Sequence, residues 1–291
     1  MIVLNVTINL IDGLAFGGLL FLLAVGLTMI FGLVDVLNLA HGAFYMVSGY
    51  LALMVLGGGA PSLAMFAGLL VLSALVGGVL GLGLNLTLKP LGNRGHLEQA
   101  LLTLGLSMVL AEAVLHLAGR GFRSILPPAE LRGSIMLGEA QFPTYRLVVI
   151  GVSAVLALAT YLVFEKTKLG SLTRAAIDDP EMLAGLGYDV RKIRVGVIAT
   201  GSALAGVAGL LGAPLLNLRP GLDNEVLTLA LIVIVVGGLG SIKGAALGAV
   251  LIGLIQTLGQ AYLPQVAAFM LFGLMVLVLL VRPRGLFGRA A

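Results

Sequence analysis

The sequence predicts an all-α polytopic membrane protein with eight or nine transmembrane segments, some of them short or discontinuous. Composition carries most of this prediction: hydrophobic residues make up 59% of the 291 residues and charged residues only 10%. A soluble domain carries about a quarter charged residues, because its surface must face water. The mean hydropathy of +1.13 is correspondingly high. Since each span needs roughly 20 apolar residues, the chain is long enough for several.

Nine apolar segments, separated by polar breaks, make up most of the chain. They cover residues 8–31, 35–57, 61–88, 98–118, 144–164, 193–217, 225–240, 244–263 and 266–281. Nothing outside them is long enough for a soluble domain, so we expect residues 1–291 to form a single transmembrane domain. The shorter segments leave the number of full spans at eight or nine.

The distribution of Lys and Arg predicts which loops lie inside the cell. Residues 89–98, residues 165–194, Lys243 and the tail after Val281 together hold twelve of the seventeen basic residues. Cytoplasmic loops are enriched in Lys and Arg, and alternation of sides from the C-terminus puts all four regions on one face. We therefore expect a multi-pass membrane protein with a cytoplasmic C-terminus. The loops at 119–144 and 217–224 then lie outside.

Segment 225–240 is short and leads into a run of regularly spaced glycines. Its sixteen residues cover about 24 Å as a helix, less than the roughly 30 Å hydrocarbon core. Gly240, Gly244 and Gly248 recur every four residues. This pattern is typical either of a discontinuous transporter helix or of a tilted helix that packs through a GxxxG face. Both interpretations predict close helix contacts here.

The stretch 165–194 is a charged loop that holds eleven of the thirty formal charges. It contains an N-cap, a first-turn proline, an acidic first turn and terminating glycines, which predict a short helix outside the membrane. These signals come from Asp178 or Asp179, Pro180, Glu181, Gly185 and Gly187. Its six basic and five acidic residues are interleaved, which favours a protein partner over nucleic acid or an anionic bilayer. The alternative is a solvated loop that only marks the cytoplasmic side.

Four polar residues fall on one face of the segment 35–57, and they are Asn38, His41, Tyr45 and Ser48. Polar side chains at bilayer depth normally face the bundle interior or a wet cavity. Either this polar stripe lines a translocation path, where His41 and Asn38 offer hydrogen bonds to a zwitterionic or amide solute, or it makes hydrogen bonds between closely packed helices.

Farther along, Glu112, His116 and Arg120 recur every four residues. They indicate either an ion pair near the interface or a contact for a soluble binding protein.

Four blocks of the chain resemble one family, in the same order. They are "GLTMIFGLVDVLNLAHGAFYMVSGY" (26–50), "RAAIDDPEMLAGLGYDVRKIRV" (174–195), "VIVVGGLGSIKGAALGAVLIG" (233–253) and "LLVRPRGLFG" (279–288). The chain resembles, nearly end to end, the LivH-type permease subunit of the branched-chain amino acid ABC importers. The resemblance implies a permease of the bacterial cytoplasmic (inner) membrane for branched-chain or other hydrophobic amino acids delivered by a periplasmic solute-binding protein. It also implies two ABC ATPase subunits and a second permease subunit, either a LivM-type relative or a second copy.

The resemblance further implies that the loop presents a coupling helix to an ATPase, with the contact running from Arg174 to Gly187. The residues concerned are Arg174, Ala175, Ala176, Asp178, Asp179, Pro180, Glu181, Gly185 and Gly187. Better-known importers open this motif with Glu-Ala-Ala, whereas here Arg174 precedes the two alanines.

The chain carries no nucleotide-binding motif of its own. G-x-x-x-x-G-K-[ST] does not occur, so ATP and Mg²⁺ are expected on the partner ATPase subunits and no cofactor on this chain. Three scattered histidines and no cysteine form no catalytic or metal-ligand pattern, so we expect no enzyme. Two alternatives remain: the same importer class carrying urea, short amides or aromatic carboxylates, and a stand-alone channel or ion-coupled carrier. The carrier would need paired acidic residues at mid-membrane, and the acidic residues lie mainly near segment ends or in loops.

Overall fold

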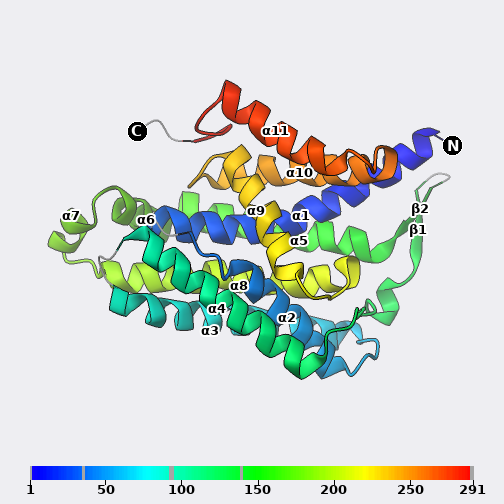
Figure 1. The fold of residues 1–291 in the computed structure, drawn as a ribbon, viewed down its shortest axis with the longest axis horizontal. Helices are drawn as coiled ribbons and strands as arrows, with labels where there is room; N and C mark the ends of the chain where they lie inside the picture. Colours follow the sequence, from blue (N-terminus) through cyan, green and yellow to red (C-terminus); the bar gives the residue numbers. More distant parts are fainter. Residues whose placement is uncertain (1, 35–36, 92–94, 138–139, 289–291) are drawn as a thin grey trace.

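The computed structural model describes residues 2–34, 37–91, 95–137 and 140–288. Over these residues the chain is mainly helical, and most of the long helices follow the long axis of the molecule (Figure 1). The helices are α1 (Ile2–Val34), α2 (His41–Leu56), α3 (Leu63–Leu88), α4 (His96–Ala118), α5 (Thr144–Lys166), α6 (Lys168–Asp178), α7 (Pro180–Gly185), α8 (Val190–Leu216), α9 (Leu222–Gly237), α10 (Ile242–Tyr262) and α11 (Ala267–Val281). Short 3₁₀ turns cover Lys89–Leu91 and Ala129–Leu131.

Six helices of the described ranges are long and apolar enough to cross a membrane. They cover Val6–Leu33, Leu63–Leu91, His96–Ala118, Thr144–Lys166, Val190–Leu216 and Ile242–Tyr262. The apolar helices α2 and α11 are shorter, and α9 has only 16 residues. Each of the nine apolar segments expected from the sequence corresponds to one of these helices, so the prediction of a helical polytopic membrane protein is confirmed.

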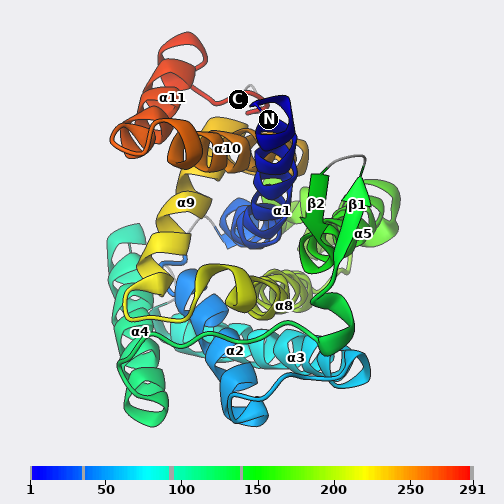
Figure 2. The same ribbon diagram turned by 90° about the vertical axis from the view of Figure 1, so that its right-hand side faces the viewer.

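Helices α1 and α8 form the centre of the bundle, as Figure 2 shows, and the other helices surround them. In their most apolar stretches 78% and 72% of the residues are buried, against 22% in each of α3, α4 and α5. The outer helices expose large apolar side chains such as Val79, Val109 and Val155. An apolar outer surface of this kind is suited to lipid.

The close helix contacts expected around the spaced glycines are present. Helix α9 ends at Gly237, a turn with positive φ at Gly238 and Gly240 follows, and α10 then packs back against α9. A side chain at Gly244 would overlap the carbonyl group of Gly237, and one at Gly248 would overlap that of Val233. The two helices therefore form a hairpin whose backbones touch.

The loops at 119–144 and 217–224 lie at one end of the bundle and contact each other. The backbone N–H of Arg123 donates to the carbonyl of Leu218 at 2.8 Å, and the reverse bond is 2.7 Å long. A small antiparallel hairpin, β1 (Ser134–Leu137) with β2 (Ala140–Pro143), belongs to the same region and is the one feature of the described chain that departs from the all-α prediction. In Figure 1 this end lies on the right with the N-terminus, and α6, α7 and the C-terminus lie on the left.

Candidate functional site

The loop between α5 and α8 folds into the two short helices α6 and α7 at the end of the bundle opposite the hairpin (Figure 1). Helix α6 begins at Lys168, directly after α5, and ends at Asp178. Gly170 lies against the carbonyl of Phe164, where any side chain would overlap the last turns of α5. This contact between the last turn of α5 and the first turn of α6 fixes the direction in which α6 leaves α5.

Helix α7 follows the capping signals of its sequence. The carboxylate of Asp179 accepts a hydrogen bond from the backbone N–H of Met182 at 2.8 Å, and Pro180 takes the first turn. The helix ends at Gly185, and Gly187 has a φ of 86°, which favours glycine. Of the two candidate N-cap residues, Asp178 and Asp179, it is Asp179 whose side chain caps α7.

The second half of α6 is attached to α5. The guanidinium of Arg174 turns back to α5, where it donates to the carbonyl of Phe164 and lies 3.6 Å from the carboxylate of Glu165. Ala176 is buried and Ala175 is partly buried. Residues 174–176 therefore hold the loop in place against the end of α5.

The outer part of the loop presents large apolar side chains to its surroundings. Met182 and Leu186 are 64% and 65% exposed, and Tyr188 is 49% exposed, whereas Leu183 packs inward. Charged residues rim this apolar patch, among them Asp178, Asp179 and Glu181. Exposed apolar patches with a polar rim typically mark protein interaction sites. Sequence reasoning missed these apolar residues, although a helix of six residues cannot bury both of its faces.

The exit of the loop is also capped. The carboxylate of Asp189 accepts hydrogen bonds from the backbone N–H groups of Arg191 and Lys192, at 3.1 and 3.2 Å, and so begins α8. The hydrogen bond from the Lys192 backbone lowers the pKa of the Asp189 carboxyl below its usual range. The negative cap is therefore fixed at the start of the central helix α8.

Helix α2 begins inside the bundle, after a non-helical stretch at residues 37–40. The side-chain oxygen of Asn38 accepts from the backbone N–H of Ala40 at 3.1 Å, and the hydroxyl of Thr103 on α4 accepts from that of Leu39 at 3.1 Å. Irregular backbone at membrane depth needs such partners. Thr103 was not singled out in the sequence, because its role depends on α4 lying beside this stretch.

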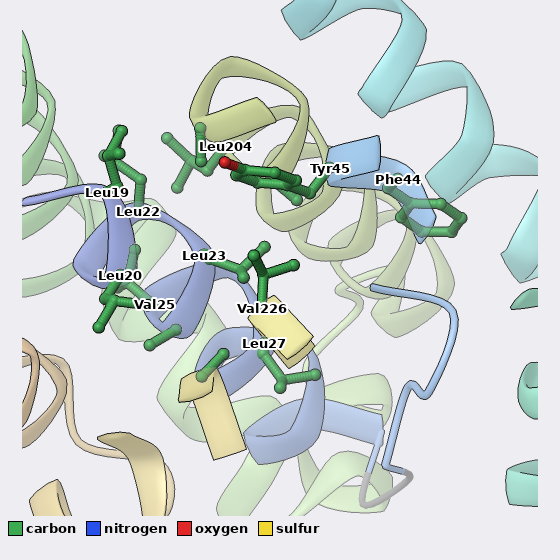
Figure 3. Packing of buried hydrophobic residues seen from close by; sticks show 14 of the residues in the cluster. Leu19, Leu20, Leu22, Leu23, Val25, Leu27, Phe44, Tyr45, Leu204 and Val226 are labelled. Atoms are coloured by element: carbon green, nitrogen blue, oxygen red, sulfur yellow. The ribbon is translucent and has the colours of Figure 1, made fainter. Parts of the chain in front are cut away.

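The four residues of the polar stripe face the interior of the bundle, and each is at most 2% exposed. His41 Nε2 donates to the carbonyl of Leu23 at 3.0 Å, which leaves Nδ1 as an acceptor. Within the described chain, the stripe atoms that lack a hydrogen-bond partner are Asn38 Nδ2, His41 Nδ1, Tyr45 Oη and Ser48 Oγ. Figure 3 shows Tyr45 and Phe44 leaving α2 in opposite directions. A buried group without a partner costs about 1–3 kcal/mol, so these atoms are suited to water or a polar ligand.

At the outer end of α4, Glu112 and Arg120 form an ion pair, and both side chains are mainly exposed. His116 lies on the same surface as Glu112. An exposed pair contributes at most about 1 kcal/mol, so its effect on stability is small. The ion pair that the spacing predicts is confirmed.

A bundle of apolar helices with a folded loop at one end, which exposes an apolar patch, defines a polytopic membrane protein. No group of three or more potential metal-ligating side chains occurs in the ranges that the structure describes. Residues 9–280 match the family described as branched-chain amino acid transport system / permease component. The chain belongs to this family.

Individual relatives carry the same description. The chain is 31% identical to the "High-affinity branched-chain amino acid transport system permease protein BraD" of Pseudomonas aeruginosa and 29% identical to the corresponding LivH of Escherichia coli, with 97% of this chain and 95% of each relative covered. It is also 29% identical, over 45% of its length, to a "Probable branched-chain amino acid transport permease protein LivM" of Methanocaldococcus jannaschii. No solved structure matches the chain.

Proposed function

We propose that the protein is the transmembrane permease subunit of an ATP-driven importer for branched-chain or other hydrophobic amino acids. The observation that carries this proposal is the apolar patch of Met182, Leu186 and Tyr188 on a folded loop outside the bundle. The family assignment supports the solute class and the need for a separate source of energy. The loop is the docking surface for an ATPase subunit, which binds the ATP and Mg²⁺.

The complete importer consists of this chain, a second permease subunit, two ATPase subunits and a periplasmic binding protein. The partial match to a LivM relative supports a related second permease. Thr173, Arg174, Lys243 and Phe287 line one pocket, so the loop, the α9–α10 turn and the C-terminal segment are neighbours. We assign this basic end to the cytoplasmic side of the inner membrane. An odd number of crossings leaves the start and the end of a chain on opposite sides of the membrane. Nine crossings rather than eight therefore agrees with the positions of the start of α1 and the segment after α11 at opposite ends of the bundle (Figure 1).

Movement of the docked loop reaches the bundle through its two attachments. The contact of Arg174 with the end of α5 transmits it to an outer helix, and the Asp189 cap transmits it to α8. Because α8 packs against α1, α2 and α3, a shift of its start repacks the centre. ATP binding to the partner would thus bias the bundle between two arrangements.

Replacement of both Asp179 and Pro180 by glycine is expected to uncouple ATP hydrolysis from uptake. Glycine in place of the Asp179 cap costs α7 roughly a few tenths of a kcal/mol, and the added backbone freedom of the two glycines destabilises the turn between α6 and α7 by about 0.5–1 kcal/mol each. In proteoliposomes with the assembled importer, solute uptake per ATP should fall by roughly fivefold or more, while membrane insertion is retained. Ser171→Gly in α6 leaves the cap intact and is the control. Undiminished uptake per ATP in the double variant would contradict the coupling role.

The polar stripe of α2 is proposed to line the translocation path when the bundle is in its second arrangement. Four unpartnered polar atoms on one buried face support this role, since water or a passing solute would satisfy them when the helices separate. His41→Ala is expected to lower uptake severalfold and also to lower the melting temperature, because it removes the Nε2 hydrogen bond to Leu23 and leaves a cavity in the bundle. Uptake and melting temperature are measured on the same preparation. A loss of stability with unchanged uptake would favour packing as the only role.

Two rivals differ from this proposal in measurable ways. An importer for urea, short amides or aromatic carboxylates would assemble in the same way but take up a different solute. A stand-alone channel or ion-coupled carrier would transport without ATPase subunits. Copurification of ATPase subunits with the chain, followed by uptake assays with each solute class, separates the three.

A further inference from the structure

A pocket of about 370 Å³ opens between α9, α10 and α11, at the end of the bundle opposite α6 and α7. Glu225, Gln256 and Gln260 contribute polar groups to its lining, and Ile232, Leu271 and Phe272 contribute apolar surface. Figure 2 shows α10 and α11 next to each other at the top of the molecule and α9 running down from them. The polar-stripe residues of α2 are not part of this lining.

The polar groups of the pocket come from one face of α9 and one face of α10, which line the same space. Glu225 and Thr228 are three residues apart on α9, and Gln256 and Gln260 are four residues apart on α10, so each pair shares one face. Gln256 lies six residues before the end of α10, about 9 Å inside that helix. Polar side chains at such depth rarely face lipid. The pocket therefore faces water or a protein neighbour.

These polar groups have free hydrogen-bonding capacity. In the part of the chain that the structure describes, no hydrogen bond is recorded for the amide groups of Gln256 and Gln260. The carboxylate of Glu225 pairs with Arg219 but is 45% exposed, so it can accept further hydrogen bonds. The pocket thus offers amide N–H donors, a negative charge and an apolar wall.

We propose that this pocket is a contact site for the solute on its way into the importer, and that it takes α-amino acids with aliphatic side chains. The ammonium group lies against Glu225, the carboxylate accepts from Gln256 and Gln260, and the aliphatic side chain contacts Ile232, Leu271 and Phe272. This inference rests on the proposed function as an amino-acid permease subunit. The pocket is open, so it binds weakly enough to release the solute. A carboxylic acid without the amino group loses its partner on Glu225.

Thiol labelling tests the site without relying on transport. The chain has no cysteine, so Ala268→Cys in the pocket lining provides a single thiol on this chain. In the assembled complex, a membrane-impermeant methanethiosulfonate should modify it, and excess leucine should slow the modification severalfold. The same concentration of 4-methylpentanoate, which is leucine without its amino group, should not. Ala261→Cys is exposed but outside the pocket lining, so leucine should not protect it. Failure of labelling, or labelling unaffected by leucine, overturns the proposal.

A transport assay gives the second, independent test. In the reconstituted importer, the double change Gln256→Leu and Gln260→Leu should lower leucine uptake by about a hundredfold, roughly tenfold for each lost hydrogen bond to a charged group. ATPase copurification should be unchanged, and Gln265→Leu, an exposed glutamine outside the pocket lining, should transport normally. If the unaltered complex takes up leucine and the double variant does so equally well, only the pocket proposal fails. If the unaltered complex takes up no leucine, the proposed function fails with it.

Discussion

Replacement of both Met182 and Leu186 by aspartate is expected to abolish copurification of ATPase subunits with the permease and, with it, ATP-driven uptake. Both side chains are about two-thirds exposed on a loop outside the lipid, and Leu183 anchors the short helix between them. Apolar residues at the centre of an interface contribute about 2 kcal/mol or more, and 1.4 kcal/mol is a tenfold change in affinity. A carboxylate in place of each would also have to be buried without a partner. Weakening of at least a hundredfold is therefore expected, roughly tenfold from each residue.

The control for this experiment carries the same chemical change at the opposite end of the molecule. Phe122 is 79% exposed in the loop after α4, and Phe122→Asp should leave ATPase copurification at the level of the unaltered protein. Membrane-inserted chain should be equal in all three preparations, because neither position lies in a span. ATPase subunits that still copurify with the double variant would show that the patch is not the docking surface. Their absence from the unaltered preparation would favour a stand-alone carrier.

The helices and the capped loop follow from local sequence. Apolar runs located the long helices of the described ranges, and the signals at Asp179 and Pro180 located the start of α7, because these structures depend on neighbouring residues. The start of α6 was not predictable in this way. It depends on the contact of Gly170 with Phe164 across the turn between two helices. The β1–β2 hairpin was missed because strands of four residues leave almost no periodic signal.

The candidate sites depend on distances that sequence spacing does not contain. Helical periodicity correctly groups Asn38, His41, Tyr45 and Ser48 on one face, but it does not say which helices cover that face. Thr103 reaches the start of α2 from a helix more than sixty residues away. Glu225 and Gln256 likewise face one pocket only because α9 and α10 fold back on each other at their glycines. Sequence therefore predicts faces, and packing decides which faces become sites.

Gly209→Ala is expected to destabilise the protein by about 3 kcal/mol or more, although alanine is the better helix former by about 1 kcal/mol. A Cβ at this position of α8 would overlap the backbone carbonyl of Tyr45 on α2, and a backbone group cannot rotate away as a side chain can. Overpacking of a tight core costs about 1–3 kcal/mol, and more where the backbone must move. The neighbouring Gly206 is packed in the same way against the carbonyl of Ser73 on α3. The backbone of α8 is thus in direct contact with the backbones of α2 and α3 at these two glycines.

The same helix provides the matched comparison. Gly196 is exposed near the start of α8 and has open space where a Cβ would lie, so Gly196→Ala should keep or slightly raise the thermal midpoint. The two variants differ only in what surrounds the added methyl group, and the opposite signs of their effects isolate the helix contact from helix propensity. Thermal unfolding of the purified protein in detergent measures both. If Gly209→Ala melts at or above the temperature of Gly196→Ala, α2 and α8 do not touch at this glycine. The proposed translocation path along α2 would then not be supported by close packing of α2 against α8.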